Sequence, residues 1–397
     1  MPFWERFKGK EVPHIKGLET RSSNSLTDGA KFFLQSFGLA LLQQESVARI
    51  KQNVFISPLS IFLALAMTEN GAAGETKVAM RKVLAFPTDA GDEAVNESAA
   101  ALLKSLQSRG EAELAIANAL WVDVKSTISP DFARVCQKIY DAATETLDLS
   151  KHSSASTIND WVTEKTRGKI SHIVTPGNIA DAIAVLTNAV YFKSKFYIPF
   201  EKKGTQPRPF YLADGNEKVV PMMRNYGLPD SYRSGKEFEA AVLRYKDSGI
   251  ELYMLLPTRG TSPEQILTEH SVRELLVAKG PIELDLSMPR FAIDFSSGLK
   301  ESLTRLGMGI AFQYPGADFL ALGSPLFYLS EVIHKTRLEV DEEGTVAAAA
   351  TAVVMTLGAC MPQRVETKTL VFDHPFAVLL RDTVTGAIIF AGVVYEP

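Results

Sequence analysis

The sequence predicts an α+β protein in which helices come first and strands follow. Apolar residues recur at helical spacing early in the chain, and from about residue 184 they form the short runs that are typical of strands. No Pro/Ser-rich linker and no internal repeat divides the 397 residues. A helical half followed by a strand-rich half, without a seam, favours one large domain.

Helices are predicted in the N-terminal half from the spacing of apolar residues and from helix-end signals. The first has its apolar positions at Phe33, Leu34, Phe37, Ala40 and Leu41. The second begins at Ser57 and Pro58, which supply an N-cap and a first-turn proline. More helix is expected to about residue 110. Residues 159–170 form a further helix, closed by Gly168.

Dense apolar runs predict the strands. Residues 114–124 are expected to form a buried strand, and the same is expected of 184–192, 241–245 and 251–257. The C-terminus is predicted to be a hairpin with strands at 376–380 and 387–394 and a turn at 382–386.

Composition excludes several classes of partner. The chain has 42 basic and 46 acidic side chains, and a net charge of −4 argues against a nucleic-acid-binding surface. No segment approaches the roughly 20 consecutive apolar residues of a membrane helix, and the first ten residues are too charged for a secretory signal. We expect no nucleic-acid or membrane partner. We expect a cytoplasmic location, with release from the cell by another route as the alternative.

Enzyme signatures are absent from the sequence. It contains no G-x-S-x-G, H-E-x-x-H or phosphate-binding-loop motif, and its six histidines do not pair at ligand spacing with one another or with Cys136 or Cys360. We therefore predict no catalytic residue, no metal and no cofactor. His334 lies on the apolar face of an alternating segment, which indicates a buried and hydrogen-bonded core residue.

The most unusual stretch is residues 345–357 (TVAAAATAVVMTL), which follow 341–344 (DEEG). It has no charge, no proline and no glycine, so an exposed strand of this sequence would be an aggregation hazard. Its alanines favour helix, whereas Thr351 and Val353 are β-branched and favour strand. Residues 358–364 (GACMPQR) are typical of an exposed loop. A strand-competent segment therefore leads directly into a loop.

Several motifs, in this order, make the chain resemble the serpins from about residue 28 to 397. They are 53–60 (NVFISPLS), 187–193 (TNAVYFK), 334–336 (HKT) leading into 342–345 (EEGT), and 372–376 (FDHPF). On this basis residues 1–27 are expected to be an N-terminal extension. Residues 28–397 are expected to be a single serpin domain, with its reactive-centre loop at about 344–364.

The resemblance implies the serpin fold, an α+β architecture with a large central β-sheet, surrounding helices and an exposed reactive-centre loop. It also implies a suicide-substrate inhibitor of a serine protease, and not an enzyme. The protease attacks the loop, forms an acyl-enzyme, and is trapped when the cleaved loop inserts into the central sheet as a new strand. Such a protein needs no cofactor and is expected to be a monomer.

The resemblance also assigns site residues. The reactive bond is expected at Gly358–Ala359, with Leu357–Gly358 as the second choice. A polar cluster beneath the opening strands of the sheet is expected to contain Ser57, Asn188 and His334. The hinge is expected to comprise Glu342, Glu343, Gly344, Thr345, Val346, Ala347, Ala348, Ala349 and Ala350.

The sequence departs from the family pattern at Phe196, where serpins usually have tryptophan. Phenylalanine keeps most of the bulk but lacks the indole N–H. This position lies in the segment expected near the entry of the loop, so the packing there is expected to differ.

The sequence determines the type of target protease less closely than the fold. Leu357 suits a chymotrypsin-like or elastase-like protease better than a trypsin-like one. Cleavage at Arg364–Val365 would lengthen the inserting arm. Two other functions stay open: a non-inhibitory serpin that acts as a chaperone or carrier, and an inhibitor of a papain-like cysteine protease. The uncharged stretch from Ala347 to Ala350 counts against the first.

Overall fold

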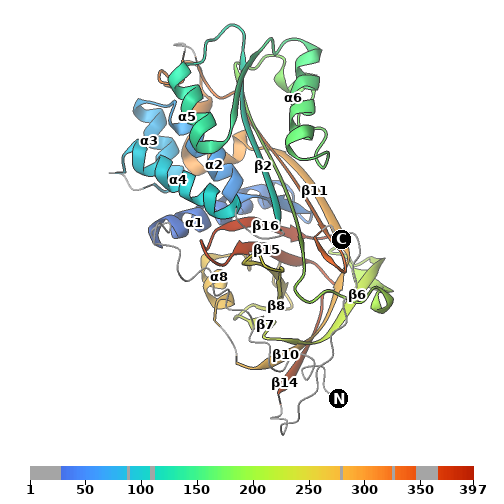
Figure 1. Cartoon of the computed structure of the whole chain (residues 1–397). Coiled ribbons are helices and arrows are strands. Elements are labelled where there is room, and N and C mark those ends of the chain that lie inside the picture. The colour runs from blue at the N-terminus through green and yellow to red at the C-terminus, as the bar shows by residue number, and fades with distance from the viewer. Residues whose placement is uncertain (1–27, 87–89, 108–111, 278–279, 324–326, 346–364) are drawn as a thin grey trace.

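The structure is a computed structural model that describes residues 28–86, 90–107, 112–277, 280–323, 327–345 and 365–397. The predicted reactive bond and the hinge residues from Val346 to Ala350 lie outside this part of the chain. Within it, helices and several β-sheets occur together, which confirms the α+β class. The helices gather mainly on one side of the upper half, and sheets make up most of the lower half (Figure 1).

Most of the helices precede residue 180. They are α1 (Asp28–Ala48), α2 (Pro58–Glu69), α3 (Gly74–Val83), α4 (Asp92–Gln107), α5 (Pro130–Tyr140), α6 (His152–Lys165) and α7 (Pro176–Ile179), followed by α8 (Glu269–Leu275) and α9 (Lys300–Leu303). Short turns of helix are η2 (Lys202–Gly204), η3 (Thr304–Met308) and η4 (Gly309–Phe312).

The helix α2 begins as the sequence predicts, with Pro58 in its first turn and the Ser57 side chain accepting a hydrogen bond from the amide of Ser60. The predicted end of α6 is wrong. This helix stops at Lys165, before Gly168, because Arg167 and Gly168 both take positive φ angles, of 53° and 77°.

The strands form three sheets. They are β1 (Val54–Ile56), β2 (Glu113–Asp123), β3 (Ala143–Leu147), β4 (Ala184–Lys195), β5 (Gln206–Tyr211), β6 (Glu217–Pro229), β7 (Tyr232–Ser234), β8 (Phe238–Arg244), β9 (Ile250–Pro257), β10 (Ile282–Pro289), β11 (Phe291–Gly298), β12 (Glu331–Val340), β13 (Gly344–Thr345), β14 (Glu366–Val371), β15 (Phe376–Asp382) and β16 (Ile388–Val394). The predicted strands and the C-terminal hairpin are confirmed, with boundaries shifted by a few residues.

The sheet that we call the long sheet has the strand order β11-β12-β13-β4-β2-β3. Side chains alternate between its two faces. On one face Ala189 and Ile333 pack with Ile158 of α6, and on the other face Phe192 belongs to the main core that includes α2. Figure 1 shows α6 on one side of this sheet and the N-terminal helices on the other. The long sheet is therefore covered on both faces.

The centre of the long sheet contains an unusual pairing. The strands β12 and β4 run parallel and pair directly from Glu331↔Val185 to Arg337↔Tyr191. Beyond that point they separate, and β13 lies between them, antiparallel to both. The long sheet is thus split at one end, and among the described residues Gly344 and Thr345 occupy the split.

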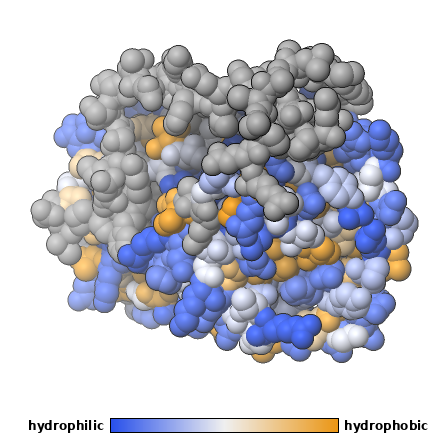
Figure 2. Space-filling model, turned by 90° about the horizontal axis from the view of Figure 1, so that it is seen from below, coloured by the Kyte–Doolittle hydropathy of each residue, from blue (hydrophilic) through white to orange (hydrophobic). Residues whose placement is uncertain are grey.

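The other two sheets build the rest of the molecule. One has the order β1-β16-β15-β9-β8-β7, and its core includes Phe55 stacked on Phe390 with ring centroids 5.0 Å apart. The four-stranded sheet, β14-β10-β6-β5, occupies the lower end in Figure 1. Seen from that end, hydrophobic patches lie between hydrophilic residues (Figure 2). Among the described residues, none of the helices has the length and apolar character needed to cross a membrane.

We predict that Gly392→Ala destabilises the protein. A Cβ atom at Gly392 would lie 2.4 Å from the carbonyl oxygen of Val54, and the backbone of the neighbouring strand cannot move away cheaply. We expect a loss of about 1–3 kcal/mol in the free energy of unfolding, measured by urea denaturation. Gly177→Ala is the control, because nothing lies within 4 Å of its Cβ position. Equal effects of the two substitutions would contradict this account.

Candidate functional site

The described part of the hinge, Glu342–Thr345, turns back from β12 into the split of the long sheet. The amide of Asp341 donates to the carbonyl of Gly344 at 2.8 Å, which closes a tight turn. The carbonyls of Glu342 and Glu343 accept hydrogen bonds from the amides of Phe200 and Phe196 at 2.7 and 2.8 Å. Backbone bonds therefore hold the turn against the segment that follows β4.

A buried carboxylate anchors this turn. The Glu342 side chain is 2% exposed, and its Oε1 accepts hydrogen bonds from Thr205 Oγ1 at 2.6 Å and Arg290 Nη2 at 2.5 Å. Burial alone would raise the pKa of Glu342, but these two bonds outweigh it and hold the pKa below its usual value. Glu343 pairs with Lys202 at 2.7 Å on the outside. Glu342 thus remains ionised and attached.

Gly344 fits the split because it has no side chain. Its φ is +147°, and a Cβ atom there would lie 2.3 Å from the carbonyl oxygen of Ser194. Thr345 then pairs with Val340 on one side and with Ser194 on the other, and it is fully buried. The hinge therefore already provides the first residues of a strand between β12 and β4.

An aromatic cluster lies beneath Thr345. Tyr245 stacks on Phe196 with centroids 5.0 Å apart and meets Phe192 edge-on at 5.1 Å. Its hydroxyl lies 2.6 Å from Thr345 Oγ1. The position that departs from the family pattern, Phe196, is therefore part of the packing under the hinge.

The structure brings Ser57, Asn188 and His334 together in one hydrogen-bond network beneath the parallel pair. The amide of Ser57 donates to His334 Nε2 at 3.0 Å, so this nitrogen carries no proton. The proton lies on Nδ1, which donates to Asn188 Oδ1 at 2.5 Å. Asn188 Nδ2 in turn donates to Ser60 Oγ and Asn118 Oδ1. The network ties α2 to three strands of the long sheet.

Burial keeps His334 neutral. Its side chain has no exposed surface, and loss of hydration lowers its pKa to about 3. Nε2 accepts one bond and Nδ1 donates the other, so both ring nitrogens are satisfied in the neutral form. The position of His334 agrees with a structural role and not with that of a metal ligand.

Several residues at the site had not been predicted. Ser60 and Asn118 complete the polar cluster, while Thr205, Tyr245 and Arg290 hold the hinge. Ser60 lies one helical turn after Ser57, a weak signal that the sequence offers. The others reach the site only through strand pairing and loop packing, for which the sequence has no local signal.

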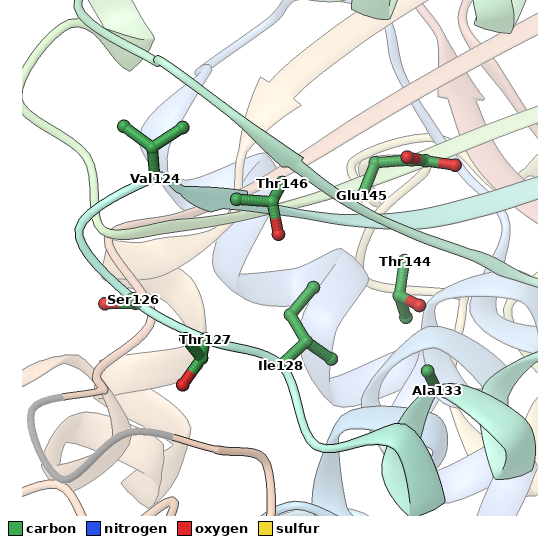
Figure 3. Close-up of a pocket in the computed structure, with 8 residues that line it drawn as sticks. All are labelled: Val124, Ser126, Thr127, Ile128, Ala133, Thr144, Glu145 and Thr146. Carbon is green, nitrogen blue, oxygen red and sulfur yellow. The ribbon is translucent and has the colours of Figure 1, made fainter.

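Two of the open pockets among the described residues bear on the search for a site. One, of about 710 Å³, lies beside the hinge and is lined by Lys202, Arg290, Phe291, Ala292, Glu339, Val340, Asp341, Glu342 and Pro397. The other, of about 570 Å³, lies between the edge strand β3 and the segment before α5. Its only ionisable lining residue is Glu145, which Figure 3 shows directed away from the Ser126 and Thr127 hydroxyls. That lining provides no acid–base pair.

Buried Cys136 is not a candidate nucleophile. It is fully buried, and burial raises the pKa of its thiol to about 12. Among the described residues, no three histidine, cysteine, aspartate or glutamate side chains gather as metal ligands. The predicted reactive bond lies outside the described residues, so the hinge and the polar cluster are the parts of the predicted site that the structure describes.

A family model described as Serpin (serine protease inhibitor) matches residues 33–397. The chain belongs to the serpin family. Two curated serpins illustrate the similarity. Serpin B6 of Macaca fascicularis is 33% identical over 91% of this chain and 98% of its own. Antithrombin-III of Mus musculus is 34% identical over 87% of this chain and 76% of its own.

Solved serpin structures share the fold. Tengpin, a thermophilic serpin in its native state, superposes with a TM-score of 0.83 at 30% identity and covers 95% of this chain and 96% of its own. Thyroxine-binding globulin in complex with thyroxine gives 0.82 at 25% identity, over 92% of this chain and 99% of its own. The serpin fold is therefore confirmed. Serpins are generally protease inhibitors and not enzymes, but the family also includes this thyroxine-binding member.

We predict that burial of neutral His334 makes the stability of this serpin depend on pH. The unfolded chain binds a proton at this histidine below about pH 6.5, whereas the folded protein does not do so until about pH 3. This contribution to the free energy of unfolding is therefore complete above pH 6.5. It falls by about 1.4 kcal/mol per pH unit as the pH drops towards 3.

Urea denaturation at a series of pH values between 7.5 and 4 measures this slope. The His334→Gln variant should show a smaller dependence of the free energy of unfolding on pH, by the amount that one proton contributes. This difference is expected even if the variant is less stable at every pH. A His334→Gln variant with an unchanged slope would show that the pKa of His334 is not lowered in the folded state.

Proposed function

We propose that this serpin is a suicide-substrate inhibitor of a serine protease, and that it traps the acyl-enzyme by inserting its cleaved reactive loop into the long sheet. The observation that carries the proposal is the place of Gly344 and Thr345 between β12 and β4. An inserted loop would only have to continue the strand that these two residues begin.

The strand registers support continued insertion. Thr345 faces Val340 and Ser194, so an antiparallel continuation would bring residue 348 opposite both Arg337 and Tyr191, which now pair with each other. The same counting brings residue 354 opposite Glu331 and Val185, the last pair of the parallel ladder. An inserted strand in a single register would therefore pair with β12 and with β4 along the whole ladder, and no register shift is needed.

The energetics also favour insertion. An inserted strand replaces one parallel ladder with two antiparallel ladders, and parallel pairing is slightly less stable per residue. On the order of ten additional backbone hydrogen bonds, at about 1 kcal/mol net each, amount to about 10 kcal/mol. This is comparable with the whole stability of a typical domain. We infer that the uninserted form is kinetically trapped.

The polar cluster supplies part of the barrier in this proposal. Residue 351 would come between His334 and Asn188, so their hydrogen bond must break before the loop passes. Residue 351 is a threonine that would lie on the same face as Thr345 in an inserted strand, so its hydroxyl could replace the lost partner. An apolar residue at 351 would leave both side chains unsatisfied, which is costly in a buried site.

The chemistry of capture needs only the loop and the protease. The catalytic serine oxygen of the protease attacks the carbonyl carbon of Gly358, the Gly358–Ala359 bond breaks, and the Ala359 amine leaves with a proton. Insertion then competes with hydrolysis of the ester. We propose a chymotrypsin-like or elastase-like target in preference to a trypsin-like one. A carrier or chaperone function and inhibition of a papain-like protease are the alternatives to be tested.

We predict that Thr345→Arg converts the inhibitor into a substrate. Thr345 is fully buried beside Tyr245, and a guanidinium group there would lose its hydration without gaining a partner. Insertion would become slower than hydrolysis of the acyl-enzyme ester. We expect covalent, SDS-stable complex to fall at least about tenfold, which corresponds to a barrier higher by about 1.4 kcal/mol. Undiminished complex with the variant would refute the proposed mechanism.

The matched control is Thr146→Arg, the same change at an exposed position on the edge strand β3 of the same sheet. It should leave complex formation unchanged. Both proteins should be tested against a panel of active-site-titrated serine and papain-like proteases. If the unaltered protein forms a complex with no member, the inhibitory function is wrong. Thermal unfolding before and after loop cleavage then tests the carrier alternative, which predicts no large rise in Tm.

The reactive bond gives a separate prediction. Mass spectrometry of the C-terminal fragment released from the complex should give a peptide that begins at Ala359. A fragment that begins at Gly358 would support the second choice, Leu357–Gly358. A fragment that begins at Val365 would overturn both assignments, because the protease would then read Arg364.

A further inference from the structure

Tyr245 is held rigidly beneath the entry of the long sheet. It follows β8 directly, forms an isolated antiparallel bridge with Phe196, and is 4% exposed. Its ring is fixed on two sides, stacked on Phe196 and edge-on to Phe192. The ring therefore has little freedom to follow the hinge if the hinge moves.

The hydroxyl of Tyr245 points at the hinge. It lies 2.6 Å from Thr345 Oγ1, and among the described residues Thr345 is its one hydrogen-bond partner. Burial raises the pKa of Tyr245, so the phenol stays neutral and one of the two hydroxyls donates to the other. If Thr345 left the split, the buried Tyr245 hydroxyl would lose the hydrogen-bond partner that it now has, which disfavours withdrawal.

The other contacts of the hinge hold residues that come before Thr345. The anchor on Glu342 holds the turn before Gly344, and the backbone bonds to Phe196 and Phe200 end at Glu343. Thr345 is held by its strand pairing with Val340 and Ser194 and, through its side chain, by the bond to Tyr245. Among the described residues, the Tyr245–Thr345 bond is thus the side-chain hydrogen bond of the hinge that lies farthest along the chain.

We propose that Tyr245 is a positioning residue that seats Thr345 at the entry of the long sheet and thereby favours insertion of the cleaved loop over hydrolysis of the acyl-enzyme. The inference rests on the proposed inhibitory function. Its physical basis is nucleation: the first pairs of a new strand cost conformational entropy, and each later pair follows in register at less cost. Because Thr345 is already paired between the two strands, the entropy of forming the first pairs is lost before the protease cuts the loop.

Two substitutions remove the bond and little else. Tyr245→Phe deletes the phenol oxygen and keeps both ring contacts, and Thr345→Val replaces the other hydroxyl with a methyl group. Each should speed hydrogen–deuterium exchange of the amides of residues 342–345 about fivefold in the absence of protease. Each should also raise the stoichiometry of inhibition about twofold or more. The double variant should be no worse than either single variant, because the two side chains act as one unit.

The control is Tyr140→Phe, which removes another buried hydroxyl, bonded to Asn96 Oδ1 at 2.7 Å at the end of α5. It should leave both exchange at 342–345 and the stoichiometry unchanged. Unchanged exchange in Tyr245→Phe, additive effects in the double variant, or an equal effect of Tyr140→Phe would each overturn the proposal. If no protease forms a complex with the unaltered protein, the inhibitory function fails, and exchange alone decides whether Tyr245 holds the hinge.

Discussion

In the middle of the long sheet, β4 and β12 pair with each other although both run in the same direction. Their outer neighbours, β2 and β11, are antiparallel to them, so a strand of the opposite direction placed between β4 and β12 would complete an alternating order. In the part of the chain that the structure describes, the hinge supplies such a strand over Gly344 and Thr345. The polar cluster and the hinge anchor both act on this incomplete pairing.

Each of these elements stabilises the closed pair in its own way. The polar cluster connects β4, β12 and α2 through the uncharged imidazole of His334, and its bond between His334 and Asn188 requires that the two strands be adjacent. On the opposite face, Lys335 of β12 donates to the carbonyl of His172, in the segment after α6. At the open end, Glu342 keeps the turn attached to Arg290 and Thr205. Separation of β4 and β12 must break the bond between His334 and Asn188.

Much of this could be predicted from the sequence, and the limits are physical. The strict alternation around His334 predicts a buried histidine, and Ser57–Pro58 predicts the start of α2, because both signals are local. Asn118 joins the cluster only because β2 pairs with β4 in one register, which no local pattern reveals. Tyr245 had no signal at all, since its role depends on a loop that packs from another sheet. The end of α6 was misplaced because the positive φ of Arg167 cannot be read from its residue type.

The common register of β12 and β4 has a consequence for changes in chain length. Because side chains alternate along a strand, deletion of one residue between Thr345 and position 351 would turn every later side chain to the opposite face. In the proposed inserted strand, Ala352 would then take the place of Thr351, and the hydroxyl of Thr351 would no longer meet His334 and Asn188. Single-residue insertions and deletions should therefore be tolerated less in this segment than most substitutions of one small residue for another, and pairs of such changes should partly restore each other.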